Sequence, residues 1–261
     1  MKHRHRRGPR ASRAHHRARR VGTVSDAHFD PLVHVAQDDH PDQVGEARAD
    51  AGRAIRDIGH ALVGHHAAIG LLEEVTHSLD GLTERLDDGD PRSRSEVRRD
   101  GQFDGPEPDG SVMTSYDERP VSGRASPWGL DIEVRRDGDE AVASLTLRAA
   151  HEGAPGRSHG GIVAALFDDV FGFVLQLHAQ SAFTGELSMR YEAGVPIGEP
   201  LCCRTRLDRR EGRELYMTGE LTTEATGQVL ARSTATFIAI DPSQFDPGVD
   251  TGARHRNGSA R

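Results

Sequence analysis

The chain has almost no lysine, because Lys2 is the only one among 261 residues and arginine supplies the remaining positive charge. Cysteine is almost as scarce. Cys202 and Cys203 are adjacent, a placement that rarely gives an unstrained disulfide. A disulfide framework is therefore excluded, and a reducing cytoplasm is the simpler prediction for the location. We find neither a run of membrane-span length nor the apolar region of a secretion signal, so we expect no membrane partner.

Aromatic residues are also few, at 5% of the chain, and the net charge of −8 gives a pI near 6.0. An acidic protein of this kind is not built mainly to hold nucleic acid. The first twenty residues are an exception, since they carry nine lysines and arginines and no acid. No aromatic side chain is interleaved with them to stack on bases, so we expect no nucleic-acid partner.

Residues 1–112 form an extension of different character from the rest. Apolar residues recur at helical spacing from Val44 to Leu86, but glycines interrupt them, each costing about 1 kcal/mol relative to alanine. We predict a basic arm, weak helices and a disordered linker over Asp87–Gly110. The many histidines here lack the cysteine partners and fixed spacing of a zinc site. Two interpretations stay open: an accessory segment, or a true translation start at Met113, after which a complete compact domain follows.

Residues 113–241 predict one α+β domain, in which strands surround a single helix. Apolar and polar residues alternate, as in half-buried strands, and turn residues separate the runs. The runs cover residues 130–134, 141–147, 187–191, 201–207, 215–221 and 229–240. Short connections between them favour an antiparallel meander of five to six strands curved around the helix. Residues 242–261 are predicted to be a disordered tail.

The helix itself is the most informative feature. Residues 159–175 are apolar on every side, yet they carry Asp168 and Asp169 in the middle. An ionised carboxylate buried there is costly unless it is paired, and the sequence shows no obvious charged neighbour. We therefore expect chemistry at one of the two. Adjacent helix positions point about 100° apart, so only one should face a given site.

These residues resemble the hotdog-fold acyl-CoA thioesterases, with the closest likeness to the phenylacetate-pathway (PaaI-like) branch. The resemblance covers about residues 129–240 and none of the extension. Its motifs are Gly-Arg-Ser-His-Gly-Gly-Ile-Val-Ala-Ala-Leu-Phe-Asp at 156–168, Thr-Gly-Glu-Leu-Ser-Met-Arg-Tyr at 184–191, Val-Pro-Ile-Gly at 195–198 and Ala-Arg-Ser-Thr-Ala-Thr-Phe at 231–237. Some relatives carry asparagine six positions before the motif histidine, where this chain has Gly153.

The resemblance implies a hotdog fold that hydrolyses an acyl-CoA thioester without metal or cofactor. It selects Asp168 over Asp169 as general base or nucleophile, and it gives the oxyanion-binding N–H to Gly160. A glycine at a helix start lets an acyl group approach free N–H groups closely. Eight residues separate Gly160 from Asp168, about 12 Å along one helix, so one copy cannot bring both to one carbonyl. We expect the site to form across a homodimer, or within a dimer of dimers, with one group from each copy.

Several further residues are candidates by the same resemblance. Thr184 could hold the attacking water or Asp168, and His159 could orient the loop or donate near the thioester. Gly161 is a candidate for substrate binding. Arginine pairs well with phosphate, which makes Arg190 and Arg232 candidates for the CoA phosphates, although a solvated strand face is the more common explanation for such residues. The alternative function is a hotdog that binds acyl-CoA as a sensor or regulator without hydrolysing it.

Overall fold

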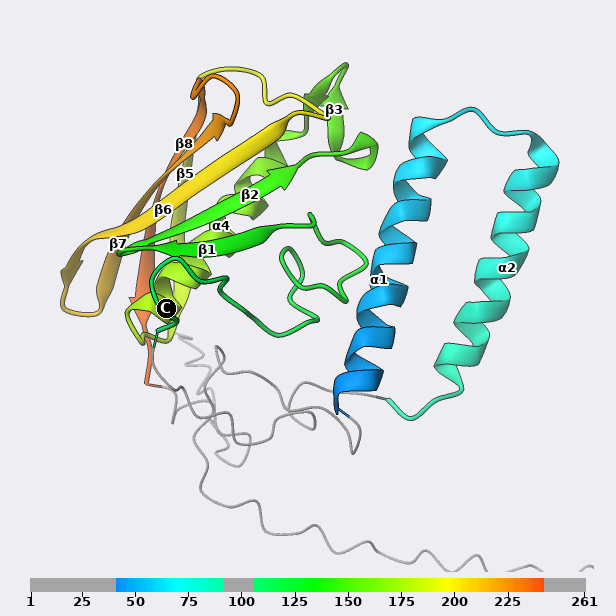
Figure 1. Ribbon diagram of the computed structural model, residues 1–261, viewed down its shortest axis with the longest axis horizontal. Coiled ribbons are helices and arrows are strands. Elements are labelled where there is room, and N and C mark those ends of the chain that lie inside the picture. Colours follow the sequence, from blue (N-terminus) through cyan, green and yellow to red (C-terminus); the bar gives the residue numbers. More distant parts are fainter. Residues whose placement is uncertain (1–40, 92–105, 242–261) are drawn as a thin grey trace, which may run out of the picture.

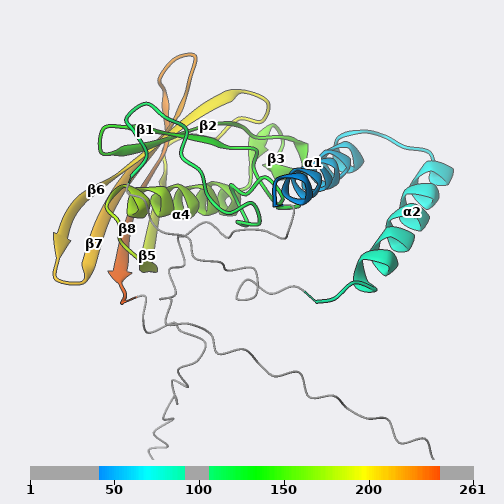
Figure 2. The same cartoon turned by 60° about the horizontal axis from the view of Figure 1, so that its bottom comes forward.

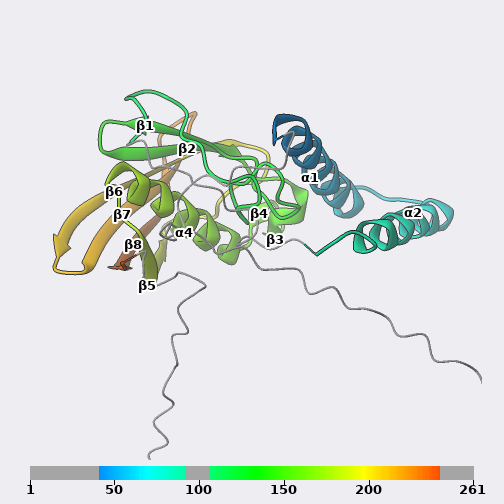
Figure 3. The same ribbon diagram turned by 90° about the horizontal axis from the view of Figure 1, so that it is seen from below.

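The computed structural model describes residues 41–91 and 106–241, shown in colour in Figure 1. The basic arm, the tail over 242–261 and most of the predicted linker over residues 87–110 lie outside the described residues. The described chain forms a sheet domain and two N-terminal helices. In Figures 1 and 3, α1 lies against the domain and α2 lies beyond α1.

The helical pattern of the extension becomes two regular helices, α1 (Pro41–Gly64) and α2 (Ile69–Asp87). The face of α1 that packs against the domain is not the apolar stripe seen in the sequence. Its buried positions are Gly45, Ala49, Gly52, Arg56 and His60. A Cβ at Gly52 would lie 2.5 Å from the Ala125 carbonyl oxygen, so the small residues permit close approach. The glycines that weaken the helix in the sequence are therefore its contact surface.

The apolar stripe of the extension remains uncovered in the single chain. Val44, Ile55 and Leu62 of α1 are exposed and lie to one side of its buried face, about 100° or more around the helix. Within the described residues, α2 has no buried residue at all. The stability of α1 on the domain must therefore come from its polar and small-residue face.

Six antiparallel strands form the main sheet, in the order β1-β2-β6-β7-β8-β5. Their bounds are β1 Glu133–Asp137, β2 Glu140–Thr146, β5 Ala182–Tyr191, β6 Pro200–Glu211, β7 Glu214–Thr223 and β8 Val229–Ala239. Each strand overlaps one of the predicted runs, but the predicted sequential meander is wrong at one place. β5 leaves the chain order and pairs with β8 at the sheet edge, while β2 pairs with β6.

Between β2 and the central helix lie short elements that lead into the site. They are the 3-10 turn η1 (Ala149–His151) and the small hairpin β3 (Glu152–Ala154) with β4 (Arg157–Ser158). The predicted start of the first strand at residue 130 is too early. Asp131 has a positive φ of 50°, which ends extended structure there, and β1 begins at Glu133.

The central helix α4 (Gly160–Leu177) lies along the inner face of the sheet (Figure 2). Phe167 and Phe171 are fully buried between it and the strands. β7 passes so closely that a Cβ at Gly219 would lie 2.9 Å from the Phe167 ring. By length and composition α4 could cross a membrane, which the sequence reading did not foresee, but 61% of it is buried inside this domain. Its apolar surface is thus the core of the fold.

Candidate active site

The N-terminus of α4 is capped by the histidine of the His-Gly-Gly motif. His159 has extended backbone, and its Nδ1 accepts a hydrogen bond of 3.0 Å from the Gly161 N–H. Its carbonyl oxygen accepts from the N–H of Ile162. We find no acceptor for the Gly160 N–H among the described residues. The predicted oxyanion donor is therefore available, whereas the Gly161 N–H is already used by the cap and cannot serve a substrate at the same time.

The departure at Gly153 has a steric reason. A Cβ there would lie 2.8 Å from the His159 Cα and 3.0 Å from its Cβ. A larger residue would displace the capping histidine, so the asparagine of some relatives has no room in this chain. Gly153 lets the β3–β4 hairpin pack directly against the start of α4.

Asp168 and Thr184 come together as a hydrogen-bonded pair. The Thr184 hydroxyl donates to Asp168 Oδ1 over 2.7 Å, and both residues are exposed in the single chain. The pairing of β5 with β8 shifts register between Thr184 and Glu186, so Gly185 is the extra residue of a bulge. Bulges re-aim side chains next to active sites. The helix is therefore not buried on every side, because Asp168 faces solvent with one oxygen held by Thr184.

Asp169 is the buried carboxylate, and it does have a charged partner. Arg119 Nε donates to its Oδ1 over 2.7 Å, and Arg119 Nη2 donates to its backbone carbonyl. The guanidinium also lies 4.5 Å from the centre of the Phe173 ring. Gly172 leaves room for it, because a Cβ there would collide with Arg119. The partner lies 50 residues before Asp169, which is why no neighbour was visible in the sequence.

A cavity of about 460 Å³ opens beside the Gly160 end of α4. Tyr191, at the end of β5, lines it and donates from its hydroxyl to the Gly160 carbonyl over 2.7 Å. A Cβ at Gly160 would lie 3.1 Å from that hydroxyl, so glycine is needed for the close contact. Tyr191 belongs to the quoted motif, but sequence reasoning gave it no role. Asp168 is not among the residues that line this cavity.

Arg190 and Arg232 are neighbours across β5 and β8 and are both occupied by carboxylates. Arg190 pairs with Glu192 at 2.9 Å, and Arg232 pairs with Glu220 and lies 3.8 Å from Glu192. Arg190 alternates with Tyr191 along the strand, so it lies on the opposite face of the sheet from the cavity. The structure does not bring these arginines to Asp168 or Gly160 within one copy.

The two cysteines lie on β6 and are free. Burial raises the pKa of the Cys203 thiol far above its usual range, so it stays protonated. A protonated, buried thiol is not a nucleophile. The carboxylate of Asp168 is the better candidate for chemistry on this domain.

Comparison with known proteins agrees with this architecture. The family model described as "Thioesterase superfamily" matches residues 156–230, from the hairpin before α4 to the start of β8. A crystal structure of the thioesterase superfamily protein RHA08564 aligns with a TM-score of 0.62 at 21% identity, covering 79% of this chain and 99% of that one. The domain therefore has the hotdog fold. Its fold class is as the sequence predicted.

Two curated proteins to which part of this chain is similar are acyl-CoA thioesterases. The acyl-coenzyme A thioesterase THEM5 of Homo sapiens is 29% identical over 37% of this chain and 39% of its own length. THEM4 of Bos taurus is 26% identical over 44% of this chain and 48% of its own. The chain thus spans less than half the length of these relatives. The PaaI protein of E. coli is a more distant structural match, at a TM-score of 0.40, and membership of its branch stays a prediction.

Proposed function

We propose that this protein hydrolyses an acyl-CoA thioester to the free acid and CoA. The observation that carries the proposal is the Asp168–Thr184 pair, a carboxylate exposed at the middle of an apolar helix with one oxygen oriented by a hydroxyl. Its other oxygen is free to act as a base or nucleophile. The similarity to curated acyl-CoA thioesterases supports this substrate class.

As a general base, Asp168 takes a proton from a water whose oxygen attacks the thioester carbonyl carbon. The carbonyl oxygen becomes negative, and the unused Gly160 N–H at the start of α4 stabilises it. The carbon–sulfur bond then breaks, and the CoA thiolate takes the proton back from Asp168. If Asp168 attacks directly instead, its carboxylate oxygen bonds to the carbonyl carbon, the carbon–sulfur bond breaks and CoA leaves as its thiolate. Water then hydrolyses the resulting mixed anhydride to the free acid and the Asp168 carboxylate.

A homodimer supplies the two halves of the site. Gly160 and Asp168 lie on one continuous helix, about 12 Å apart along its axis. β5 carries Thr184 and is the outermost strand of the sheet, so its outer edge can accept a strand of a second copy. Pairing there would bring the Gly160 end of one α4 toward the Asp168–Thr184 pair of the other. Assembly into tetramers and a cytoplasmic location remain predictions.

The test is release of free CoA thiol from a panel of acyl-CoA esters by the wild type and by Asp168→Asn. We expect the variant to lose at least about 100-fold in kcat with little change in KM, because the substituted amide can neither accept the proton nor attack. Asp208→Asn, on the far part of β6, is a matched control that should keep wild-type turnover. Saturable acyl-CoA binding without hydrolysis by the wild type would instead favour the sensor function. Full activity of Asp168→Asn would refute the assignment.

A further inference from the structure

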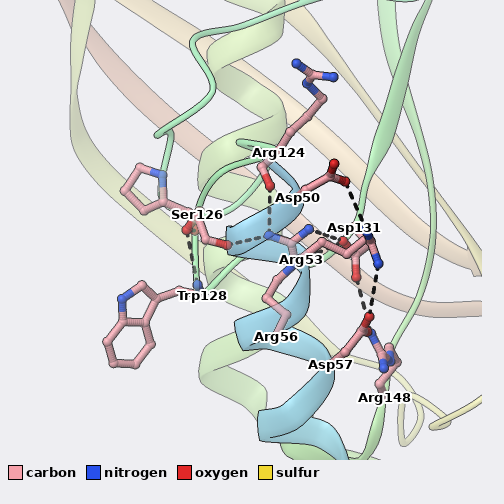
Figure 4. Close-up of polar contacts among 10 residues, drawn as sticks. Asp50, Arg53, Arg56, Asp57, Arg124, Ser126, Trp128, Asp131 and Arg148 are labelled. Carbon is pink, nitrogen blue, oxygen red and sulfur yellow. Dashed lines mark hydrogen bonds and ion pairs between the residues drawn. The ribbon is translucent and has the colours of Figure 1, made fainter. Parts of the chain in front are cut away.

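The helix α1 is fixed to the hotdog domain by a buried arginine. Arg56 is only 7% exposed, and its Nε and Nη2 donate to Asp131 Oδ1 over 3.0 and 2.6 Å. Its Nη1 donates to the carbonyl oxygens of Arg124 and Ser126 (Figure 4). The next residue, Asp57, accepts from Arg148, which directly precedes η1. All these contacts join α1 to segments that lie outside the sheet.

The next buried residue of α1, His60, reaches the turn η1 itself. Its Nδ1 accepts a hydrogen bond of 3.0 Å from the Ala150 N–H. The neighbouring His151 closes the turn, because its Nδ1 accepts from the Arg148 N–H over 3.0 Å. The two rings meet edge to face, with centres 4.6 Å apart, and both residues are 7% exposed. Each ring nitrogen that accepts is neutral, so the pair needs two uncharged imidazoles.

From His151 the contacts continue to the start of α4. The His151 carbonyl oxygen accepts from the His159 N–H over 2.9 Å. His159 in turn caps α4 and precedes Gly160, whose N–H has no acceptor among the described residues. Gly153 packs against His159 from the intervening hairpin. Two hydrogen bonds, joined through the consecutive residues Ala150 and His151, therefore connect α1 to His159. His159 directly precedes Gly160, the proposed oxyanion donor.

We propose that His60 is a positioning residue for the active site: through Ala150 and His151 it fixes the place of His159 and of the Gly160 N–H. This inference rests on the proposed function for its kinetic consequence. The N-terminal helix is then part of the catalytic unit, although the sequence left open whether it belongs to the protein. His60 touches neither the substrate nor the reacting atoms.

The positioning role of His60 follows from what its removal would cost. Without His60 the Ala150 N–H loses its acceptor in this part-buried contact, and nothing then holds the turn against α1 at that point. A shift of the His151 carbonyl would displace the His159 N–H that it binds. Small displacements of a catalytic donor have large kinetic effects, because the donor must be aimed where negative charge develops.

The experiment compares His60→Ala, His60→Asn and His77→Ala in the full chain. Asparagine can restore an acceptor oxygen near the Nδ1 position, whereas alanine cannot. His77 is an exposed histidine of α2 and serves as the matched control. We measure kcat and KM for the best acyl-CoA substrate of the panel, and amide hydrogen exchange of the peptide covering residues 149–164.

For His60→Ala we expect a kcat about tenfold lower with an unchanged KM, and faster exchange across residues 149–164. His60→Asn should recover most of both, and His77→Ala should behave as wild type. If His60→Ala lowers only the unfolding midpoint, with kcat and this exchange unchanged, the inference is wrong. If the wild type shows no hydrolysis, the proposed function fails, and the exchange measurement alone still decides whether His60 holds the turn.

Discussion

Replacing Arg119 by methionine tests the distinction between the two carboxylates of α4. Arg119 comes from the segment before β1, and its side chain crosses Gly172 to reach Asp169. Asp169 is 7% exposed, and its Oδ2 has no hydrogen-bond partner among the described residues. Arg119 is therefore the group that compensates the buried charge. Methionine keeps much of the apolar length of the side chain over Phe173 and removes only the guanidinium.

The expected loss of stability follows from what remains behind. Breaking a buried ion pair by removing one partner costs about 3–5 kcal/mol, because the other charge stays buried without compensation. Loss of the guanidinium contact with the Phe173 ring adds roughly 1 kcal/mol at most. With an m-value of about 2–3 kcal/mol/M in urea, the unfolding midpoint of Arg119→Met should fall by about 1–2 M.

The assay is urea unfolding followed by far-ultraviolet circular dichroism at pH 7.5. The double variant Arg119→Met/Asp169→Leu is the matched control, since replacing both partners by apolar groups is often neutral or stabilising. We expect it to recover most of the stability. Because Asp168 does not contact Arg119, the folded double variant should also keep thioester hydrolysis. A loss below about 1 kcal/mol in Arg119→Met would refute the view that this pair compensates a buried charge.

Two further predictions concern the site and its support. Thr184→Val removes the hydroxyl that donates to Asp168 at nearly constant volume, so kcat should fall about tenfold while Thr184→Ser keeps most activity; equal rates for both variants would contradict the role of the hydroxyl. Burial, with His60 and Arg148 nearby, lowers the pKa of His151 from 6.5 to about 4, and burial and Arg148 also lower the pKa of His60. Arg148, Arg56, Asp57 and Asp131 are the charged groups around this histidine pair, the two carboxylates opposing the shift. Between about pH 6.5 and 4 the unfolded chain therefore binds more protons than the folded chain. The neutral histidine pair contributes its full stabilisation of the folded state above about pH 6.5 and loses it as the pH falls toward 4. For His151 this loss is on the order of 3 kcal/mol. Unfolding midpoints between pH 7.5 and 4.5 should show this slope, and the double variant His60→Asn/His151→Asn should weaken it.

The strands and the central helix were predictable because each buries one face, which leaves a period in the sequence. β7 alternates buried and partly exposed residues along its whole length, and α4 is apolar on every side. The place of β5 was not predictable from such a pattern. Pairing with β8 instead of β6 is decided by how α4 crosses the sheet, and no local signal records that choice.

The helix α1 was visible, but its buried face was not. A hydrophobic pattern assigns the stripe with Val44, Ile55 and Leu62 to the core, whereas the structure leaves these residues exposed. The docking face consists of glycine, alanine, one arginine and one histidine, residues that pattern reading treats as weak helix formers or solvent-facing groups. The spacing of three and four residues between them indicated a common helix face. That this face is the buried one is shown only by the hydrogen bonds to Asp131 and Ala150, which the sequence does not reveal.

The two carboxylates illustrate the same limit at the candidate site. The cost of burying charge correctly predicted that a carboxylate inside an apolar helix must have a specific reason, but it could not tell which reason belonged to which residue. The charge of Asp169 is compensated by an arginine distant in sequence, so its burial needs no substrate to explain it. Asp168 has a single neutral hydroxyl as partner and faces solvent in one copy. Hydrolysis at this carboxylate needs a surface that covers the substrate and excludes bulk water from it. The exposure of Asp168 is therefore itself an argument that a second copy completes the site.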